Sequence, residues 1–303
     1  MGQGVPSPSI EGRASAGRAN PDDPPDGVIA RTPMSAVQER TLEQDAGQHR
    51  PVHEHRYAVE RAKWDAHAAA GEEQIELPPL GVDFGSHAPK QILLAGMAEF
   101  LGPLQGKRVI EYGCGLGKLT VLLARSGADV TAFDLSAESV ATARRRLELD
   151  GLEDRVTFAV AAGEELPFED GAFDAAVGKA VLHHLDPVSG SRELARILRP
   201  GGRAAFSEPL GTNPIVVFAR EHVPYSSKHD RGADIPLRLA DVEAWMAPFS
   251  EGHISGVHLF AMVERLFGFD HPIAPLREYD RLLLKRWPGL WPLCRYAVLT
   301  LRR

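Results

Sequence analysis

The chain has 303 residues, of which 44% are hydrophobic and 25% are charged, a composition that excludes wholesale disorder and supplies a sizeable apolar core. Its formal net charge of −7 disfavours a nucleic-acid partner, because domains that bind phosphate backbones carry excess positive charge. Two cysteines, Cys114 and Cys294, are too few for a disulfide framework or a zinc site. No apolar run reaches the roughly 18 residues of a membrane span, and the N-terminus lacks the apolar segment of a signal peptide, so we expect a cytoplasmic protein.

The N-terminal residues differ in composition from the rest of the chain. Residues 1–30 hold five Pro, five Gly and three Ser, and the first aromatic residue is Tyr57. Such a segment buries too little apolar surface to offset the entropy of ordering it. We therefore expect a disordered tail over 1–45 and a single domain over 46–303. His53 and His55 follow the tail without a nearby thiol ligand, and we expect them to be solvated and no metal to be bound.

Two helices are predicted before the first strand. Residues 57–70 have a helical pattern that Gly71 ends, and residues 87–101 place Ile92, Met97 and Leu101 on one face. We expect this N-terminal part, 46–104, to form a lid.

Strands and helices then alternate. Short apolar strands are predicted over residues 107–112, 128–134, 155–160, 172–178 and 203–209. Helices are predicted between them, over residues 119–125, 136–149 and 191–198. This alternation predicts an α/β fold with a doubly wound, mainly parallel sheet, and it places ligands at the carboxyl ends of the strands.

The rhythm changes after residue 210. Helices are predicted over 237–246 and 276–285, and strands over 253–260 and 296–303. We expect a binding core over 105–210, and a substrate cap with the closing strands over 211–303.

A glycine-rich turn links the first strand to the first helix of the core. Gly113, Gly115 and Gly117 let backbone N–H groups approach a polar ligand at a helix N-terminus. Asp134 ends the next strand, 21 residues after Gly113, where a carboxylate can accept hydrogen bonds from both hydroxyls of a ribose. The spacing predicts a cofactor that carries ribose. Lys118 stands where the dinucleotide fingerprint would require a third glycine, so the loop departs from that fingerprint.

The segment from Glu111 to Gly117, E-x-G-x-G-x-G, resembles the glycine loop of class I S-adenosylmethionine (SAM)-dependent methyltransferases. The resemblance continues in order through residues 162–174, 177–187 and 193–209. Residues 208–214, EPLGTNP, further resemble the ubiquinone/menaquinone-type and small-molecule branch of that family. The resemblance implies a Rossmann-like sheet of seven strands and S-adenosyl-L-methionine as the cofactor, converted to S-adenosyl-L-homocysteine (SAH).

The resemblance also implies roles for individual residues. Glycines of the loop should line the methionine moiety, with Glu111 near its amino group; Asp134 should hold the ribose and Leu135 should pack on the adenine. The backbone near Gly178 and Lys179 should complete the amino-acid pocket. Cys114 fits this loop as a small packed residue better than as a nucleophile.

One position departs from the family pattern. Relatives carry Asp where this chain has Ala162, and that Asp accepts a hydrogen bond from the adenine. Three possibilities stay open: backbone atoms near Ala162 and Gly163 take over, Glu164 moves in, or adenine selectivity is looser.

Candidates for a general base lie at the strand ends. His183 and His184 follow the fourth strand at the mouth of the expected pocket, and Glu208 ends the fifth strand. An oxygen or nitrogen nucleophile needs a base that removes its proton, and histidine titrates in the right range. The sequence does not distinguish the two histidines, and a structural role for at least one ring is the alternative.

Lid and cap residues are further candidates. Tyr57 and Trp64 lie seven residues apart on one helix face and could cover the cofactor, with cation–π attraction to its sulfonium, or anchor the helix to the core. Phe84 is another lid candidate. In the expected cap over 211–235, basic and aromatic side chains could meet an anionic acceptor, or the segment could be a solvated loop; these are Arg220, His222, Tyr225, Lys228, His229 and Arg231. Trp287 and Trp291 should add a wall to the pocket, or serve as core or dimer contacts.

The sequence thus predicts a SAM-dependent methyltransferase that acts on an O, N or C atom of a small biosynthetic acceptor, as a monomer or homodimer. Two alternatives remain: an NAD(P)-dependent oxidoreductase on the same kind of sheet, and a SAM-binding module without transferase activity.

Overall fold

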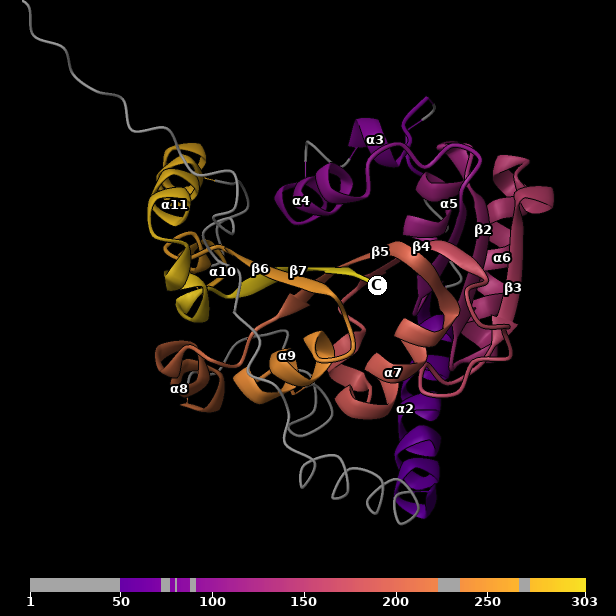
Figure 1. Cartoon of the computed structure of the whole chain (residues 1–303), viewed down its shortest axis with the longest axis horizontal. Helices are drawn as coiled ribbons and strands as arrows, with labels where there is room; N and C mark the ends of the chain where they lie inside the picture. The colour runs from indigo at the N-terminus through magenta and orange to yellow at the C-terminus, as the bar shows by residue number, and fades with distance from the viewer. Residues whose placement is uncertain (1–49, 72–76, 80, 88–90, 223–234, 267–272) are drawn as a thin grey trace, which may run out of the picture.

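A computed structural model describes residues 50–71, 77–79, 81–87, 91–222, 235–266 and 273–303 (Figure 1). Within these ranges seven strands form one sheet in the order β3-β2-β1-β4-β5-β7-β6. The strands are β1 (Arg108–Tyr112), β2 (Asp129–Asp134), β3 (Val156–Val160), β4 (Phe173–Lys179), β5 (Leu198–Pro209), β6 (Glu251–Val257) and β7 (Tyr296–Arg302). The first five are mutually parallel, and β7 runs antiparallel between β5 and β6. The predicted doubly wound, mainly parallel sheet of seven strands is confirmed.

Helices surround this sheet. The longer ones are α2 (Arg50–Gly71), α4 (Ile92–Leu101), α5 (Lys118–Arg125), α6 (Ala137–Asp150), α7 (Pro187–Ile197), α8 (Pro214–His222), α9 (Leu239–Met246) and α11 (Ala274–Arg286). The shorter ones are α3 (Phe84–His87), α10 (Met262–Leu266) and the 3-10 turns η2 (Glu153–Arg155), η3 (Leu182–His184) and η4 (Pro288–Leu293).

Alternation along the strands builds two hydrophobic cores, one on each face of the sheet. Along β5, Ala204 and Phe206 join one core and Ala205 joins the other, because successive side chains of a strand point to opposite faces. Helices α7 and α9 cover the first face, and α4 and α5 cover the second (Figure 1). The result is a three-layer arrangement in which the sheet is buried on both sides.

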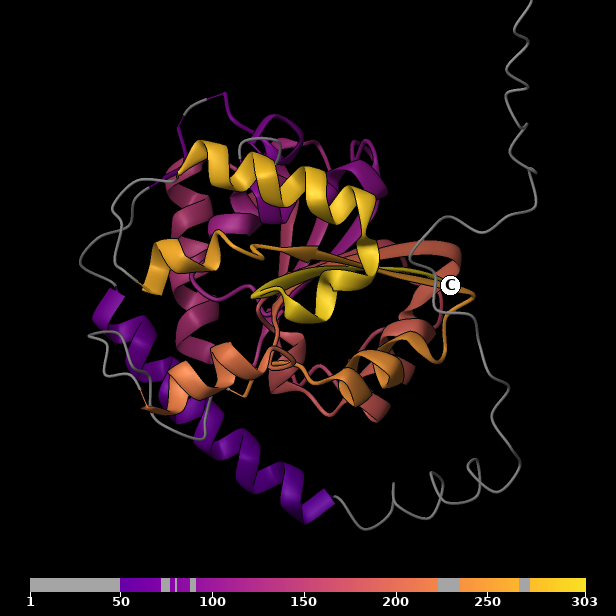
Figure 2. The same cartoon turned by 90° about the vertical axis from the view of Figure 1, so that its left-hand side faces the viewer.

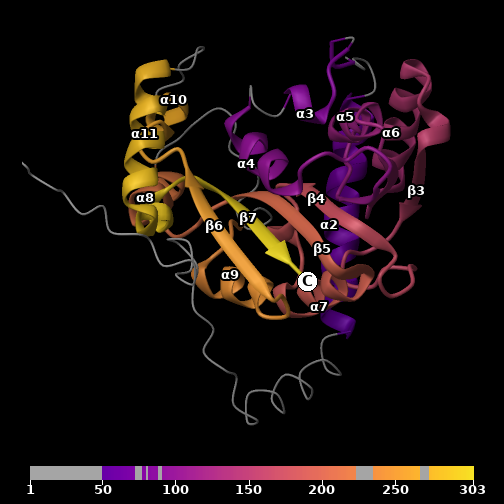
Figure 3. The same ribbon diagram turned by 45° about the horizontal axis from the view of Figure 1, so that its top comes forward.

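The carboxyl ends of the parallel strands β1 to β4 lie on the same side of the sheet, and helix α2 lies over these ends. Strands β1 and β4 pair with each other at the centre of the sheet. From β1 the chain continues to β2 and β3 on one side, and from β4 it continues to β5 on the other side, so the strand order reverses between β1 and β4. Helix α2 packs beside α6 and runs as a long separate rod past the body of the sheet (Figures 2 and 3). A crevice at such a reversal is where doubly wound sheets bind ligands.

Several predicted boundaries are corrected. The helix expected over 57–70 extends over the whole of α2. The helix expected over 87–101 is replaced by α3 and α4, and α4 begins only at Ile92, after extended Gln91. The helix expected over 191–198 starts earlier, at Pro187, because the Asp186 side chain accepts a hydrogen bond from the Ser189 N–H.

The C-terminal third also differs from expectation. Strand β6 is Glu251–Val257 and not 253–260, since His258 has φ 61° and ends the extended backbone. The strand expected over 203–209 already begins at Leu198, before the Pro-Gly-Gly segment. Helix α8 lies inside the segment that was expected to be an irregular cap, and the rest of that segment, 223–234, lies outside the described residues, as does the predicted tail over 1–45.

Within the described ranges, no helix is both long and apolar enough to cross a bilayer.

Candidate functional site

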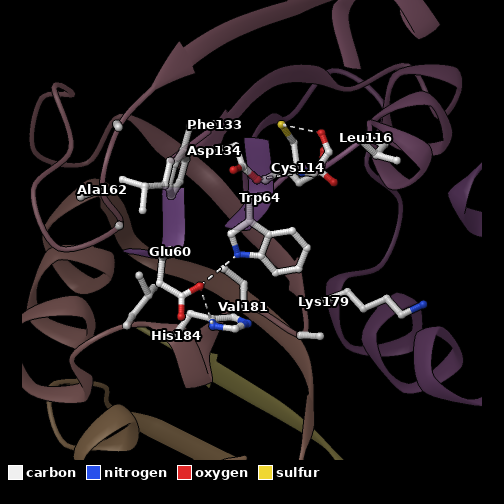
Figure 4. Close-up of a pocket in the computed structure, with 18 of the residues that line it drawn as sticks. Glu60, Trp64, Cys114, Leu116, Phe133, Asp134, Ala162, Lys179, Val181 and His184 are labelled. Atoms are coloured by element: carbon white, nitrogen blue, oxygen red, sulfur yellow. Dashed lines mark hydrogen bonds and ion pairs between the residues drawn. The ribbon is translucent and has the colours of Figure 1, made fainter. Parts of the chain in front are cut away.

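A cavity of about 470 Å³ opens at the carboxyl ends of β1 to β4 (Figure 4). Its walls come from the glycine loop, the ends of β2 and β4, the segment after β3, and helix α2. The predicted residues that line it are Tyr57, Trp64, Glu111, Gly113, Cys114, Gly115, Asp134, Leu135, Ala162, Gly163, Glu164, Lys179 and His184. Among the residues predicted to bind the cofactor or to act as a base, four do not line it: Gly117, Gly178, His183 and Glu208.

The glycine loop needs glycine for two different reasons. Gly113 has φ 63° and Gly115 has φ 48°, a left-handed backbone that other residues rarely adopt. A Cβ atom on Gly113 would also lie 2.7 Å from the Val181 side chain, whereas one on Gly115 would meet nothing within 4 Å. The loop is fixed to the sheet by the Cys114 N–H, which donates to the Phe133 carbonyl at 2.9 Å. Burial raises the pKa of the Cys114 thiol well above its ordinary value, which agrees with a packed residue and not a nucleophile.

Gly117 and Gly178 serve packing instead. Gly117 precedes α5, and a Cβ atom there would lie 2.8 Å from the Ala143 Cα in α6. A Cβ atom on Gly178 would lie 2.7 Å from the ring of Phe206. Both glycines therefore bring elements close together behind the cavity.

Asp134 orders the loop and faces the cavity at the end of β2. Its two carboxylate oxygens accept hydrogen bonds from the backbone N–H groups of Gly115 at 2.9 Å and Ser136 at 3.0 Å. Burial raises the pKa of Asp134, and these backbone donors oppose that rise. Each carboxylate oxygen has lone pairs left for a further donor, which is what a ribose diol would supply.

Glu111 is a buried polar group at the cavity without a full set of hydrogen-bond partners. Its side chain is 1% exposed, it lines the cavity, and its Oε2 atom has no hydrogen-bond partner. Burial raises its pKa to about 8, a side-chain hydrogen bond with Thr120 opposes that rise, and the nearby Asp134 charge adds to it. An ammonium group in the cavity would stabilise the charged form of Glu111, so the site fits the amino group of SAM.

The segment after β3 carries the departure from the family pattern. Ala162, Gly163 and Glu164 all line the cavity. The Oε1 atom of Glu164 accepts the Asp186 N–H at 2.9 Å and pairs with Arg56, while its Oε2 atom is buried without a partner. The Tyr57 hydroxyl also forms a side-chain hydrogen bond with Glu164. The place of Glu164 in the cavity wall keeps open the possibility that it takes over from the missing Asp.

Helix α2 covers the cavity with one face. Tyr57 and Trp64 line it, and so do Glu60 and His67, which the sequence analysis did not single out. The spacing of these four positions is that of one helical face, so the signal was present in the sequence. The Trp64 indole N–H donates to Glu60 Oε2 at 3.1 Å. Burial raises the pKa of the Tyr57 hydroxyl, and the neighbouring Glu164 carboxylate adds to the rise.

The two adjacent histidines, which the sequence could not tell apart, have different surroundings. His183 Nδ1 lies 2.7 Å from Glu208 Oε2, and both side chains are almost fully buried. The other oxygen of Glu208 accepts the backbone N–H groups of Val181 at 2.9 Å and Leu182 at 3.0 Å. Glu208 thus shapes the turn after β4 and contacts no cavity. His184 lines the cofactor-sized cavity and a second, adjoining one.

The second cavity has a volume of about 340 Å³ and lies between α2, η3 and the start of α9. It shares Glu60, His184 and Leu185 with the first cavity. Its remaining lining residues are Arg56, His183, Pro187, Ile235, Leu237, Arg238 and Asp241. Apolar, cationic and anionic side chains therefore surround it together.

Other predicted residues lie away from both cavities. Phe84 is 1% exposed in the core beneath α4, so the prediction that it belongs to a lid is wrong. Trp291 is buried against Gly256 and Trp287 is 51% exposed, and neither lines a cavity. The predicted cap residues Tyr225, Lys228, His229 and Arg231 lie outside the described residues, as do the side chains of His53, His55, Arg220 and His222. Among the residues that the structure describes, no group of three or more His, Cys, Asp or Glu side chains could hold a metal ion.

Comparison with known proteins identifies the family of the chain. The family model described as "Methyltransferase domain" matches residues 110–206. A ubiquinone biosynthesis O-methyltransferase of Sodalis glossinidius is 34% identical over 222 residues, which cover 69% of this chain and 84% of that protein.

Two other relatives match over shorter stretches. The methyltransferase GfsG of Streptomyces halstedii is 41% identical over 34% of this chain and 38% of its own length. A demethylmenaquinone methyltransferase of Clavibacter sepedonicus is 36% identical over 41% of this chain and 50% of its own length.

A solved structure supports the fold. The geranyl diphosphate C-methyltransferase of Streptomyces coelicolor A3(2), in complex with Mg²⁺, geranyl diphosphate and SAH, has a TM-score of 0.50. It is 19% identical, and the alignment covers 71% of this chain and 79% of that one. The comparisons favour a methyltransferase over the oxidoreductase that the sheet alone would also allow. The chain therefore belongs to the family of S-adenosylmethionine-dependent methyltransferases.

Proposed function

We propose that this protein transfers the methyl group of SAM to a hydroxyl oxygen of a small-molecule acceptor. The observation that carries the proposal is the convergence of three features on one cavity: the glycine loop, the Asp134 carboxylate, and the unpartnered oxygen of buried Glu111. Oxygen as the methylated atom is supported by the likeness to the O-methyltransferase of Sodalis glossinidius.

Different residues of the cavity bind different parts of the cofactor. Gly113 and Gly115 let the backbone approach the methionine moiety, and Glu111 accepts hydrogen bonds from its amino group. Asp134 accepts the ribose hydroxyls. Leu135 and the segment from Ala162 to Glu164 hold the adenine, with the Glu164 carboxylate as an acceptor for its amino group. When bound, SAM supplies an electrophilic methyl group that an in-line nucleophile displaces.

Helix α2 contributes by excluding water. The Trp64 ring stands over the cavity and is fixed by its hydrogen bond to Glu60 (Figure 4). An aromatic face near a sulfonium attracts the positive charge and keeps competing water away. Lys179 points away from Trp64 and His184, so its ammonium does not oppose that charge (Figure 4).

The acceptor occupies the second cavity, which adjoins the first at His184. Leu185, Pro187, Ile235 and Leu237 supply apolar contacts there. The cationic Arg238 supplies a site for an acidic substituent. A small acceptor also agrees with the net charge of −7, which makes nucleic acid a poor substrate, and we propose that the enzyme acts in the cytoplasm as a monomer or homodimer.

Binding of SAM and SAH by calorimetry tests the cofactor site without an acceptor. Asp134→Ala should raise the Kd for both ligands by about 10- to 100-fold, because a hydrogen bond to a charged group contributes about 1.5–3 kcal/mol. Asp134→Asn keeps the size of the side chain, and its Kd should lie between those of the wild type and Asp134→Ala. Asp129→Ala, at the exposed start of the same strand, is the matched control and should bind as the wild type does.

An unchanged Kd in Asp134→Ala with wild-type circular dichroism would contradict the proposed site. SAH release should then be measured with a panel of phenols and catechols with and without carboxylates. Tight SAM binding without SAH release from any hydroxyl acceptor would instead favour a SAM-binding module that lacks transferase activity.

A further inference from the structure

Glu60 on α2 has a role that the cofactor site does not require. Its carboxylate faces inward from the lid helix, with the side chain 13% exposed, and its Oε2 atom receives two groups. The Trp64 indole N–H donates to it at 3.1 Å, and His184 Nδ1 lies 3.4 Å away. Burial raises the pKa of Glu60, but the contacts with His184, Lys63 and Trp64 outweigh burial and leave the pKa below its ordinary value. Glu60 is therefore a carboxylate at neutral pH.

His184 stands at the junction of the two cavities. It lines both, its side chain is 14% exposed, and its ring meets the Trp64 ring edge to face at 5.7 Å. The first cavity, proposed for SAM, and the second cavity, proposed for the acceptor, meet at this ring. The His184 side chain can therefore reach an acceptor hydroxyl that extends from the second cavity toward the first.

The two neighbouring histidines are thus held by carboxylates of different origin. His183 is tied to Glu208, which belongs to the sheet and is buried behind the cavities. His184 faces Glu60, which belongs to the lid helix. Glu208 has all its contacts within the protein and serves the turn, whereas the Glu60 contact aligns a ring that borders both cavities.

The chemistry of the pair follows from what a carboxylate can do. An ionised carboxylate only accepts hydrogen bonds, so Nδ1 of a neutral His184 carries the proton when it faces Glu60. The other ring nitrogen, Nε2, then presents its lone pair. At 3.4 Å the contact is longer than a hydrogen bond, and contacts of this kind tighten when ligands fill a site.

We propose that Glu60 is a positioning residue that holds His184 as the general base of methyl transfer. This inference rests on the proposed function and adds to it the identity of the base and the class of acceptor, a protic hydroxyl that needs deprotonation. Helix α2 then has two tasks, since the same carboxylate fixes the Trp64 ring and the tautomer of His184.

In the step, the acceptor O–H gives its proton to His184 Nε2. The oxygen forms a bond to the methyl carbon, the bond between carbon and sulfur breaks, and its electron pair stays on sulfur as the thioether of SAH. The charges balance, because one positive charge leaves the sulfonium and one appears on the imidazolium. Glu60 stabilises that imidazolium, and water takes the proton afterwards.

The first experiment needs no acceptor. Nitrogen-15 NMR of the His184 ring is recorded with SAH bound at about pH 8.5, above the ordinary titration range of imidazole, with assignment from His184→Ala. The wild type should show the proton mainly on Nδ1, and Glu60→Ala should shift it toward Nε2. Glu60→Gln keeps an acceptor oxygen and should retain the wild-type tautomer. Identical ring-nitrogen shifts in the wild type and Glu60→Ala would overturn the proposal.

The second experiment is a kinetic double-mutant cycle with the hydroxyl acceptor that gives the fastest SAH release in the phenol and catechol panel. Glu60→Ala should lower kcat about 10- to 100-fold, part of the about 10²- to 10⁴-fold that a positioned base contributes. Glu60→Gln should recover part of the loss. Adding Glu60→Ala to His184→Ala should cost much less in kcat than it does in the wild type, because Glu60 acts on the proton transfer through His184.

The matched control is Glu99→Ala, which removes an exposed carboxylate on α4, and it should keep the wild-type kcat. Independent, multiplying losses in the cycle would overturn the role of Glu60. If no acceptor in the panel releases SAH, the proposed function fails, while the NMR result still decides whether Glu60 sets the His184 ring.

Discussion

At the scale of single residues, the hydrogen-bond partners of a buried acid show whether it is available to a ligand. Glu208 and Glu111 both end their parallel strands as nearly fully buried carboxylates. Glu208 has its two oxygens satisfied by Val181, Leu182 and His183, so it contributes to structure. Glu111 keeps one oxygen without a partner and faces the cavity, so it is available to a ligand. Sequence position predicted both as site residues, and only the partners separate them.

The raised pKa of Glu111 gives a prediction about stability against pH. Folded Glu111 keeps its proton up to about pH 8, whereas the unfolded chain releases it near pH 4.3. The folded state therefore binds more protons between these values, and its free energy of unfolding falls as the pH rises through this window. Glu111→Gln removes this dependence.

Urea denaturation of both proteins at about pH 5, 6.5 and 8 measures the effect. The free energy of unfolding of Glu111→Gln relative to the wild type should increase with pH, by at most about 1.4 kcal/mol per pH unit, and level off above pH 8. A difference that stays constant across the range would show that Glu111 ionises as it does in an unfolded chain.

At the scale of elements, close contacts between helices place the glycine loop. The turn before α5 passes so near α6 that a side chain at Gly117 would clash with the Ala143 backbone at 2.8 Å. The sequence predicted that all three glycines line the cofactor, but this third one serves helix packing. Likewise, the helical spacing of α2 was recognised from Tyr57 and Trp64, yet Glu60 between them was not, since its value depends on His184, which lies far away in the sequence.

Gly117→Ala tests the packing role. The substitution combines a left-handed φ of 79° with the clash against α6, and should lower the free energy of unfolding by about 2–4 kcal/mol. Gly151→Ala is the matched control, because Gly151 also has positive φ, 67°, and a Cβ atom there meets nothing within 4 Å. It should cost only about 1 kcal/mol. Equal losses in chemical denaturation would mean that the contact with Ala143 relaxes freely.

At the scale of the whole molecule, the last strand completes the sheet. β7 pairs with both β5 and β6 through seven residue pairs each, so the C-terminal residues lie inside the sheet and not at its edge. Its Val298 and Leu299 side chains join the cores on opposite faces. Both cores therefore depend on side chains of β7.

A pair of truncations tests this organisation. Deletion of residues 296–303 should abolish cooperative thermal unfolding by circular dichroism, because β5 and β6 lose their common neighbour and both cores lose apolar area. Deletion of residues 1–45, the segment predicted as a tail, should leave the Tm and the Kd for SAM unchanged. A shortened N-terminus that lowers SAM affinity would show instead that the tail belongs to the domain.

The sequence by itself determined the alternation of strands and helices, the glycine loop, the acid at the end of the second strand and, through them, the family. These are local patterns, set by the periodicity of apolar residues and by backbone conformations that only glycine adopts readily. The tertiary structure decided which of two adjacent histidines borders both cavities, that Glu208 lines neither of them, that Phe84 is core, and that Glu60 of a distant helix faces His184. Those outcomes depend on contacts between residues up to 124 positions apart, such as Glu60 and His184, and such contacts exist only once the chain has packed.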